Sequence, residues 1–317
     1  MIHKLLSSLV VGLILSTSCQ ASIPDNAYQE QTQEKFIATE GAKLFCRIMG
    51  KGAPVIVIHG GPGLSQEYLL PQMAHLAEHN LIVFYDQRGC GLSTGTLISE
   101  QINVKTYIED IDAIRKSLGV EKISLLGHSW GGILGMQYAI SHPKSVDKLI
   151  LLSTMPASSE DLALFIAEWT QRTAPYREEL HTIEASELYL AGDPQTVAKQ
   201  LEIVFQTYMY RPEDVRKLSL RRSQKAALNG FKVYEIFLNE VFMKPFNLFN
   251  DLSKLQCPTL IIHGDTDPIP LTTAEHINKA IPHSRLSVIE HCGHFPYVEQ
   301  PTELFEAIQN FLSPVGQ

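Results

Sequence analysis

The segment GHSWG, residues 127–131, has the residue types of a catalytic nucleophile. It lies between the apolar run ISLL and an apolar, helix-like stretch, and Ser129 is flanked by glycines two positions away on each side. A serine on a sharp strand-to-helix turn needs small neighbours, because the backbone there is strained and closely packed. Its Oγ is then exposed, and the next N–H points at a developing oxyanion. We therefore predict Ser129 as nucleophile and Trp130 as one oxyanion donor.

Two later segments carry the partners that a serine nucleophile requires, a base and an acid that orients it. HGDTDP (263–268) follows the run TLII, and HCGHF (291–295) follows the run LSVI. Catalytic groups of open α/β sheets gather at the carboxyl ends of strands, where both segments would lie. We predict His294 as the base and Asp267 as the acid, in the chain order serine, acid, histidine.

Each of these two predictions competes with a neighbouring residue. His291 is adjacent to its strand end, whereas His294 lies beyond a glycine on a loop that can turn back over the sheet. Asp265 is better suited to bonding turn amides, and Asp267 stands at the turn before Pro268. The other position sometimes used for the acid, after the run LILL, offers no carboxylate before Glu160.

A tetrahedral intermediate needs a second donor, and the loop HGGPG (59–63) after the first core run is placed to supply it. Glycines let backbone amides approach a substrate without side-chain clash. Gly61 is the predicted donor, with Gly60 as the alternative. No metal or organic cofactor is implied by this set of residues.

The elements that position these segments follow a regular alternation of strands and helices. Apolar runs typical of strands buried on both faces are PVIVI (54–58), LIVFY (81–85), ISLL (123–126), LILL (149–152), TLII (259–262) and LSVI (286–289). Helix-like stretches occur at 66–78, 104–118 (capped by Asn103), 130–141, 273–280 and 302–311, and a hairpin is expected at 36–49. This pattern predicts an α/β fold with a mostly parallel, doubly wound sheet.

Between residues 156 and 250 the strand pattern disappears, and the sequence is helix-like with proline breaks. We predict a helical cap over 156–250, inserted between core segments 30–155 and 251–317. Cap aromatics could line a pocket or pack the cap itself. Binding of a free ammonium group would call for carboxylates. Candidates in the cap are Glu168, Glu202, Glu235 and Glu240.

The motifs HGGPG, DQRGCGLS (86–93) and GHSWGG (127–132) together resemble those of the prolyl iminopeptidase family of α/β-hydrolases. The resemblance covers about residues 35–153 and 257–312. It implies a serine aminopeptidase that releases N-terminal residues, often proline, from short peptides. It also suggests that Arg88 braces the loops around the oxyanion site. The family's acidic cap signatures are not recognisable in this chain.

The composition of the chain and its first 21 residues bear on its possible partners and its cellular location. The 317 residues carry a formal net charge of −8, which gives no attraction for nucleic acid. Residues 1–21 have the pattern of a signal peptide, with an apolar run at 5–16 too short to span a bilayer. We predict export to a bacterial periplasm or the medium, with no membrane-spanning segment after processing. Lipidation at Cys19 is the less favoured alternative.

Three functions therefore compete at this point. The leading one is an exported aminopeptidase acting on short peptides. A carboxylesterase or lactonase on small apolar esters is the second, favoured if no cap carboxylate lies near Ser129. A non-catalytic binding protein of the same fold is the third, and the complete set of catalytic residue types argues against it.

Overall fold

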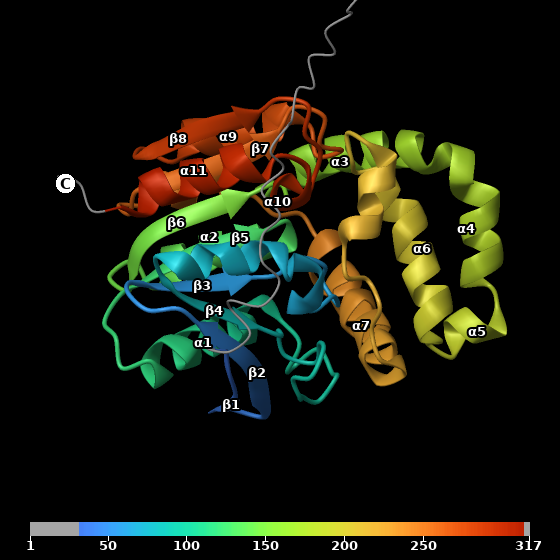
Figure 1. The fold of residues 1–317 in the computed structure, drawn as a ribbon, viewed down its shortest axis with the longest axis horizontal. Coiled ribbons are helices and arrows are strands. Elements are labelled where there is room, and N and C mark those ends of the chain that lie inside the picture. Colours follow the sequence, from blue (N-terminus) through green and yellow to red (C-terminus); the bar gives the residue numbers. More distant parts are fainter. Residues whose placement is uncertain (1–31, 314–317) are drawn as a thin grey trace, which may run out of the picture.

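The computed structural model describes residues 32–313, which form an eight-stranded sheet covered by helices, with a group of helices to one side (Figure 1). The predicted signal peptide and Cys19 lie outside these residues.

The strands are β1 Gln33–Thr39, β2 Ala42–Met49, β3 Pro54–Ile58, β4 Leu81–Tyr85, β5 Ile123–His128, β6 Val146–Leu152, β7 Thr259–Gly264 and β8 Ser284–Ile289. Their order is β1-β2-β4-β3-β5-β6-β7-β8. The β1–β2 and β2–β4 pairs are antiparallel and the others are parallel. The predicted mostly parallel α/β fold is confirmed.

Alternate residues of the central strands feed two separate hydrophobic cores. Ile56 and Ile58 face one core and Val55 and Val57 the other, as strand geometry requires. The first core is covered by α1 Val104–Ser117, α2 Trp130–Ser141 and α9 Leu271–Ala280; the second by α11 Pro301–Leu312 and the short helices α10 Pro296–Glu299, η2 Gln66–Leu69 and η3 Gln72–Glu78. Both sheet faces are thus buried, which explains the uninterrupted apolar runs.

The predicted single helix over 66–78 is wrong. The segment forms two 3-10 helices, η2 and η3, separated at Pro71. Proline has no N–H to continue a helical ladder and disfavours the helical conformation at the residue before it, so the apolar periodicity across this point was misleading. The Asn103 cap, by contrast, is present: its side chain accepts a hydrogen bond from Thr106 N at 3.0 Å.

Helices alone connect β6 to β7 and lie beside the sheet in Figure 1, where we call them the cap. They are α3 Ser159–Thr173, η4 Ala174–Tyr176, α4 Arg177–Glu184, α5 Glu187–Leu190, α6 Pro194–Gln206, η5 Pro212–Lys217, α7 Gln224–Phe237, η6 Leu238–Phe242 and α8 Phe249–Leu252. This segment leaves the core at the carboxyl end of β6, the edge at which β5 leads into Ser129 and β7 leads into Asp267, and the chain then returns to the amino end of β7.

Candidate active site

Ser129 occupies a strained turn between β5 and α2. Its φ is 54°, a backbone conformation that side chains other than glycine adopt rarely. A Cβ on Gly131 would meet the backbone carbonyl of Ile58 in β3, and one on Gly127 would meet the carbonyl of Gly131. Ser129 is nevertheless half-buried while both neighbours in sequence are buried. The turn therefore leaves Ser129 partly accessible, while His128 and Trp130 on either side of it are packed in the interior.

Asp267 and His294 form a buried pair. His294 Nδ1 lies 3.0 and 2.9 Å from the two carboxylate oxygens of Asp267, which also accepts a hydrogen bond from Ile269 N. Burial alone would raise the pKa of Asp267, but the neighbouring His294 and these hydrogen bonds hold it below its ordinary value. An ionised Asp267 makes Nδ1 the proton-bearing nitrogen, so Nε2 is left as the acceptor.

Asp265 and His291, the residues that competed with Asp267 and His294 in the sequence, make other contacts. Asp265 accepts hydrogen bonds from the backbone N–H groups of His291 and Cys292, each at 3.0 Å. His291 is exposed, with its ring against that of Tyr210 at 5.2 Å. The structure thus brings Asp267, not Asp265, to His294.

The two candidate glycines for the oxyanion site differ in their hydrogen bonds. Gly60 N–H donates to the hydroxyl of Tyr68 at 2.7 Å, so it is not available to bind an oxyanion. Gly61 has a φ of 124°, and among residues 32–313 its N–H has no hydrogen-bond acceptor. Trp130 begins α2, so its N–H is one of those that no helical carbonyl accepts. Gly61 and Trp130 therefore keep free donors, whereas Gly60 does not.

A chain of directed hydrogen bonds joins the glycine loop to the histidine loop through His128. Tyr68 Oη lies 2.7 Å from His128 Nδ1, and His128 Nε2 lies 2.9 Å from the carbonyl oxygen of His294. A carbonyl only accepts, so Nε2 carries the proton, Nδ1 accepts from Tyr68, and the tyrosine oxygen accepts from Gly60 N–H. Burial lowers the pKa of His128 to about 3, which keeps the ring neutral and this direction fixed.

Gln87 joins the glycine loop to Trp130. Its side-chain amide donates to the carbonyl of His59 at 2.6 Å and accepts from the indole N–H of Trp130 at 3.1 Å, while its backbone N–H donates to His59 Nε2. This residue belongs to the DQRGCGLS motif, but its role was missed. Arg88 of the same motif does not brace the oxyanion loops. It forms a buried pair with Asp110 of α1 at 2.6 Å and donates to Glu40 O in the β1–β2 turn.

The cap contacts both loops of the acid–base pair. His294 N–H donates to Tyr208 O at 2.8 Å, and Arg172 of α3 donates to Thr266 O at 2.8 Å. Glu299 of α10 accepts from the backbone N–H groups of Gly293 and Phe295 and from that of Tyr210 in the cap. No sequence signal marked Arg172 or Glu299, because nothing local ties a helix residue to a loop far along the chain.

The four candidate glutamates form ion pairs or are exposed. Glu168 is half-buried and pairs with Arg172 at 2.7 Å, Glu235 and Glu240 are exposed and pair with Lys232 and Lys244, and Glu202 is exposed on α6. Two aromatic residues of the cap, in contrast, contact the loop that carries His294. The ring of Tyr208 lies 5.3 Å from that of His294, and Phe205 lies 5.2 Å from Phe295.

Across residues 32–313 there is no group of three or more histidine, cysteine or acidic side chains arranged to hold a metal ion. Within the same range no helix is long and apolar enough to cross a bilayer.

Comparison with known proteins agrees with this geometry. Residues 53–301 match the family model described as the alpha/beta hydrolase fold. A proline iminopeptidase of Clostridium botulinum is 30% identical over 288 residues, covering 86% of this chain and 94% of the relative. One from Heyndrickxia coagulans is 28% identical and covers 84% and 92%. The chain therefore belongs to the α/β-hydrolase fold family and, within it, to the proline iminopeptidase family.

Solved structures show the same fold. The proline iminopeptidase of Mycobacterium smegmatis has a TM-score of 0.65 at 22% identity, covering 88% of this chain and 97% of that one. The esterase RhEst1 of a Rhodococcus species has a TM-score of 0.61 at 22% identity, covering 90% and 100%. The family model and the proline iminopeptidase relatives identify this chain as a hydrolase. The solved structures add that proteins with different names share its fold.

Proposed function

We propose that this protein is a serine hydrolase that acts through an acyl-enzyme on Ser129. The observation that carries the proposal is the buried Asp267–His294 pair beside a strained, half-buried serine. His294 Nε2 takes the Ser129 proton as Oγ attacks the substrate carbonyl, and Asp267 stabilises the imidazolium that forms. The Trp130 and Gly61 N–H groups bind the oxyanion. His294 then protonates the leaving group, and water hydrolyses the ester of Ser129.

We infer that the substrate is a short peptide, from which the enzyme releases the N-terminal residue. Support comes from the proline iminopeptidase relatives, which match this chain over most of their length. The predicted signal peptide adds that the enzyme acts outside the cytoplasm, in the periplasm or the medium.

An esterase acting on small apolar esters is the second candidate. Glu235 and Glu240 are exposed and already paired with lysines, and Glu168 is paired with Arg172. A substrate ammonium ion would have to displace these partners or bind to Glu202, which is exposed on α6, and this weakens the peptidase assignment for this cap. An ester without a charged amine makes no such demand.

The experiment compares wild-type protein and Ser129→Ala on proline and alanine arylamides and on short-chain p-nitrophenyl esters. The peptidase proposal predicts arylamide cleavage that Ser129→Ala abolishes. Ester turnover without arylamide cleavage would replace the peptidase with the esterase. Activity that survives Ser129→Ala would refute the mechanism.

A further inference from the structure

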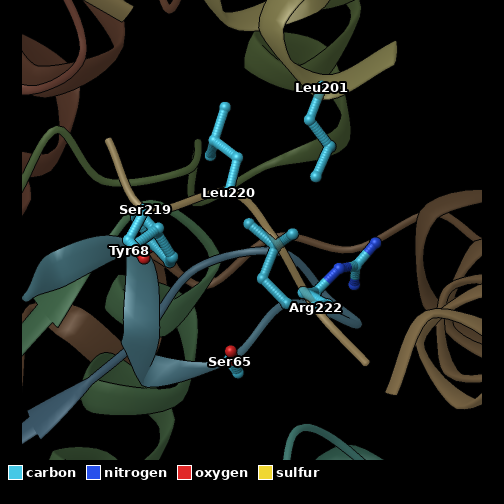
Figure 2. Close-up of a pocket in the computed structure, with 7 residues that line it drawn as sticks. Ser65, Tyr68, Leu201, Ser219, Leu220 and Arg222 are labelled. Carbon is cyan, nitrogen blue, oxygen red and sulfur yellow. The ribbon is translucent and has the colours of Figure 1, made fainter. Parts of the chain in front are cut away.

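A small recess lies where the cap meets the glycine loop (Figure 2). Leu201 of α6 and Leu220, Ser219 and Arg222 after η5 line it from the cap, and Ser65 and Tyr68 line it from the core. Its free volume is about 10 Å³, enough for one water-sized group. Tyr68 accepts the Gly60 N–H hydrogen bond, so one hydrogen bond and one peptide bond separate this recess residue from Gly61.

Arg222 brings an incompletely bonded guanidinium to this recess. Its Nη1 donates to the carbonyl of Gly63 at 2.7 Å, which fixes the group against the glycine loop. Its Nε is buried and has no hydrogen-bond partner within residues 32–313. Among the described residues no carboxylate forms an ion pair with Arg222, whereas Arg47, Arg88, Arg115 and Arg172 each have one.

Arg222 is half-buried, and a cation partly withdrawn from water costs free energy unless a paired charge or full hydrogen bonding compensates for the lost hydration. Burial accordingly lowers the pKa of Arg222, and no carboxylate offsets it. The unused N–H groups lie on one edge of the guanidinium, from Nε to Nη2. That edge has the spacing of the two oxygens of a carboxylate.

We propose that Arg222 binds a carboxylate of the substrate, with one oxygen in the recess and the rest of the ligand outside it. The recess admits an oxygen but not a side chain, and Leu201 and Leu220 give it partly apolar walls, beside which a charge pair is screened less than in open solvent. This inference rests on the proposed function of the neighbouring site. It adds to that function a preference for substrates with a free carboxylate, such as unblocked short peptides.

The test is calorimetric binding to the Ser129→Ala protein, so that it does not depend on turnover. Two matched pairs are compared at fixed ionic strength: prolyl-alanine with its C-terminal amide, and monomethyl glutarate with dimethyl glutarate. We expect the acid of at least one pair to bind about tenfold more tightly than its neutral partner, the range of a charge-assisted hydrogen bond. Hydrolysis of arylamides by wild-type protein tests the peptidase assignment separately.

Added substitutions assign the preference to a residue. Arg222→Met keeps most of the apolar stem but removes the charge, so the ratio of acid to neutral ligand affinity should fall to about one. Arg222→Lys keeps the charge but lacks the planar guanidinium, so it should leave an intermediate ratio. Arg221→Met makes the same change in net charge at an exposed neighbouring position and should keep the wild-type ratio. Equal binding of acid and neutral ligands in both pairs would overturn the proposal. So would an acid preference that persists in Arg222→Met.

Discussion

At the scale of single residues, the site depends on side chains that do not touch the reacting atoms. His128 stands between Tyr68 and the carbonyl of His294, and each hydrogen bond in this chain has only one allowed direction. The loop that offers Gly61 and the loop that carries His294 are therefore held to the same ring, next to Ser129. Small displacements of a catalytic group are expensive in rate, so these residues are positioning residues.

Tyr68→Phe tests this chain. The substitution leaves Gly60 N–H and His128 Nδ1 without partners, each at a cost of about 1–3 kcal/mol in the folded state. We expect a lower melting temperature and a kcat reduced about ten- to a hundredfold with little change in KM. Steady-state kinetics on whichever substrate is turned over gives the measurement.

The matched control is Tyr85→Phe, because the buried hydroxyl of Tyr85 has no hydrogen-bond partner in the part of the chain that the structure describes. Its removal should leave kcat unchanged and stability equal or higher. Equal kinetics for Tyr68→Phe and Tyr85→Phe would contradict the positioning role of Tyr68.

Residue types and spacing were sufficient to find Ser129, Asp267 and His294 as candidates, since each stands beside a strand end that an apolar run marks. The preference for Gly61 over Gly60 could be stated, but its reason was not visible. It depends on the Tyr68 hydroxyl, and no local pattern links that tyrosine to Gly60. Gln87 was inside a quoted motif, yet only the fold shows that it spans from His59 to Trp130.

At the scale of elements, three parts of the cap touch three loops of the core. Arg172 of α3 holds the acid loop, Tyr208 after α6 holds the base loop, and α7 lies against the glycine loop. The last contact is between backbones: a Cβ on Gly230 would meet the carbonyl of Gly63, and one on Gly63 would meet that of Gly230. The cap is thereby part of the framework that holds the three loops of the proposed active site.

Gly230→Ala tests the backbone contact. In an exposed helix interior this change stabilises by about 1 kcal/mol through helix propensity. Here we expect it to destabilise by about 1–3 kcal/mol, because α7 must move away from the glycine loop, and to lower kcat. Urea unfolding and kinetics measure both effects.

Asn229→Ala, at the adjacent position of α7, is the control and should leave stability and kcat close to wild type. A Gly230→Ala protein as stable and active as this control would show that α7 does not bear on the glycine loop.

The elements themselves were predictable to different degrees. The strands follow from apolar runs buried on both faces, and α2 from the helix-like stretch after Ser129. The two 3-10 helices of segment 66–78 were not predictable in this way, because the segment is helix-like in sequence while Pro71 interrupts a continuous helix. In the cap, helical pattern was visible, but which helix meets which loop depends on contacts such as Tyr208 with His294.

At the scale of the whole molecule, the centre of the site is a buried group of neutral imidazoles. Burial lowers the pKa of His128 to about 3 and that of His59 to about 4, from about 6.5 in an unfolded chain. Below pH about 6.5 the unfolded chain binds protons that the folded protein does not. The stability associated with these residues is therefore complete above this pH and is lost as the pH falls toward the folded values.

We expect the free energy of unfolding to fall by about 1 kcal/mol for each of the two histidines between pH 6.5 and 5.5. Urea unfolding at these two pH values measures the change. His128→Gln should reduce the loss by about half, whereas His283→Gln, at an exposed position, should leave it as in wild type. A loss that is the same in all three proteins would mean that His128 is not the group that titrates.

The proposed mechanism makes Ser129 a nucleophile that His294 activates, and peptide mass spectrometry after covalent labelling tests this most directly. The protein is treated with a fluorophosphonate, which reacts with serine nucleophiles that a base activates, and is then digested. We predict a single adduct on the peptide that contains Ser129, its loss in Ser129→Ala, and strongly slowed labelling in His294→Ala. An adduct on another residue, or equal labelling of wild type and His294→Ala, would contradict the account.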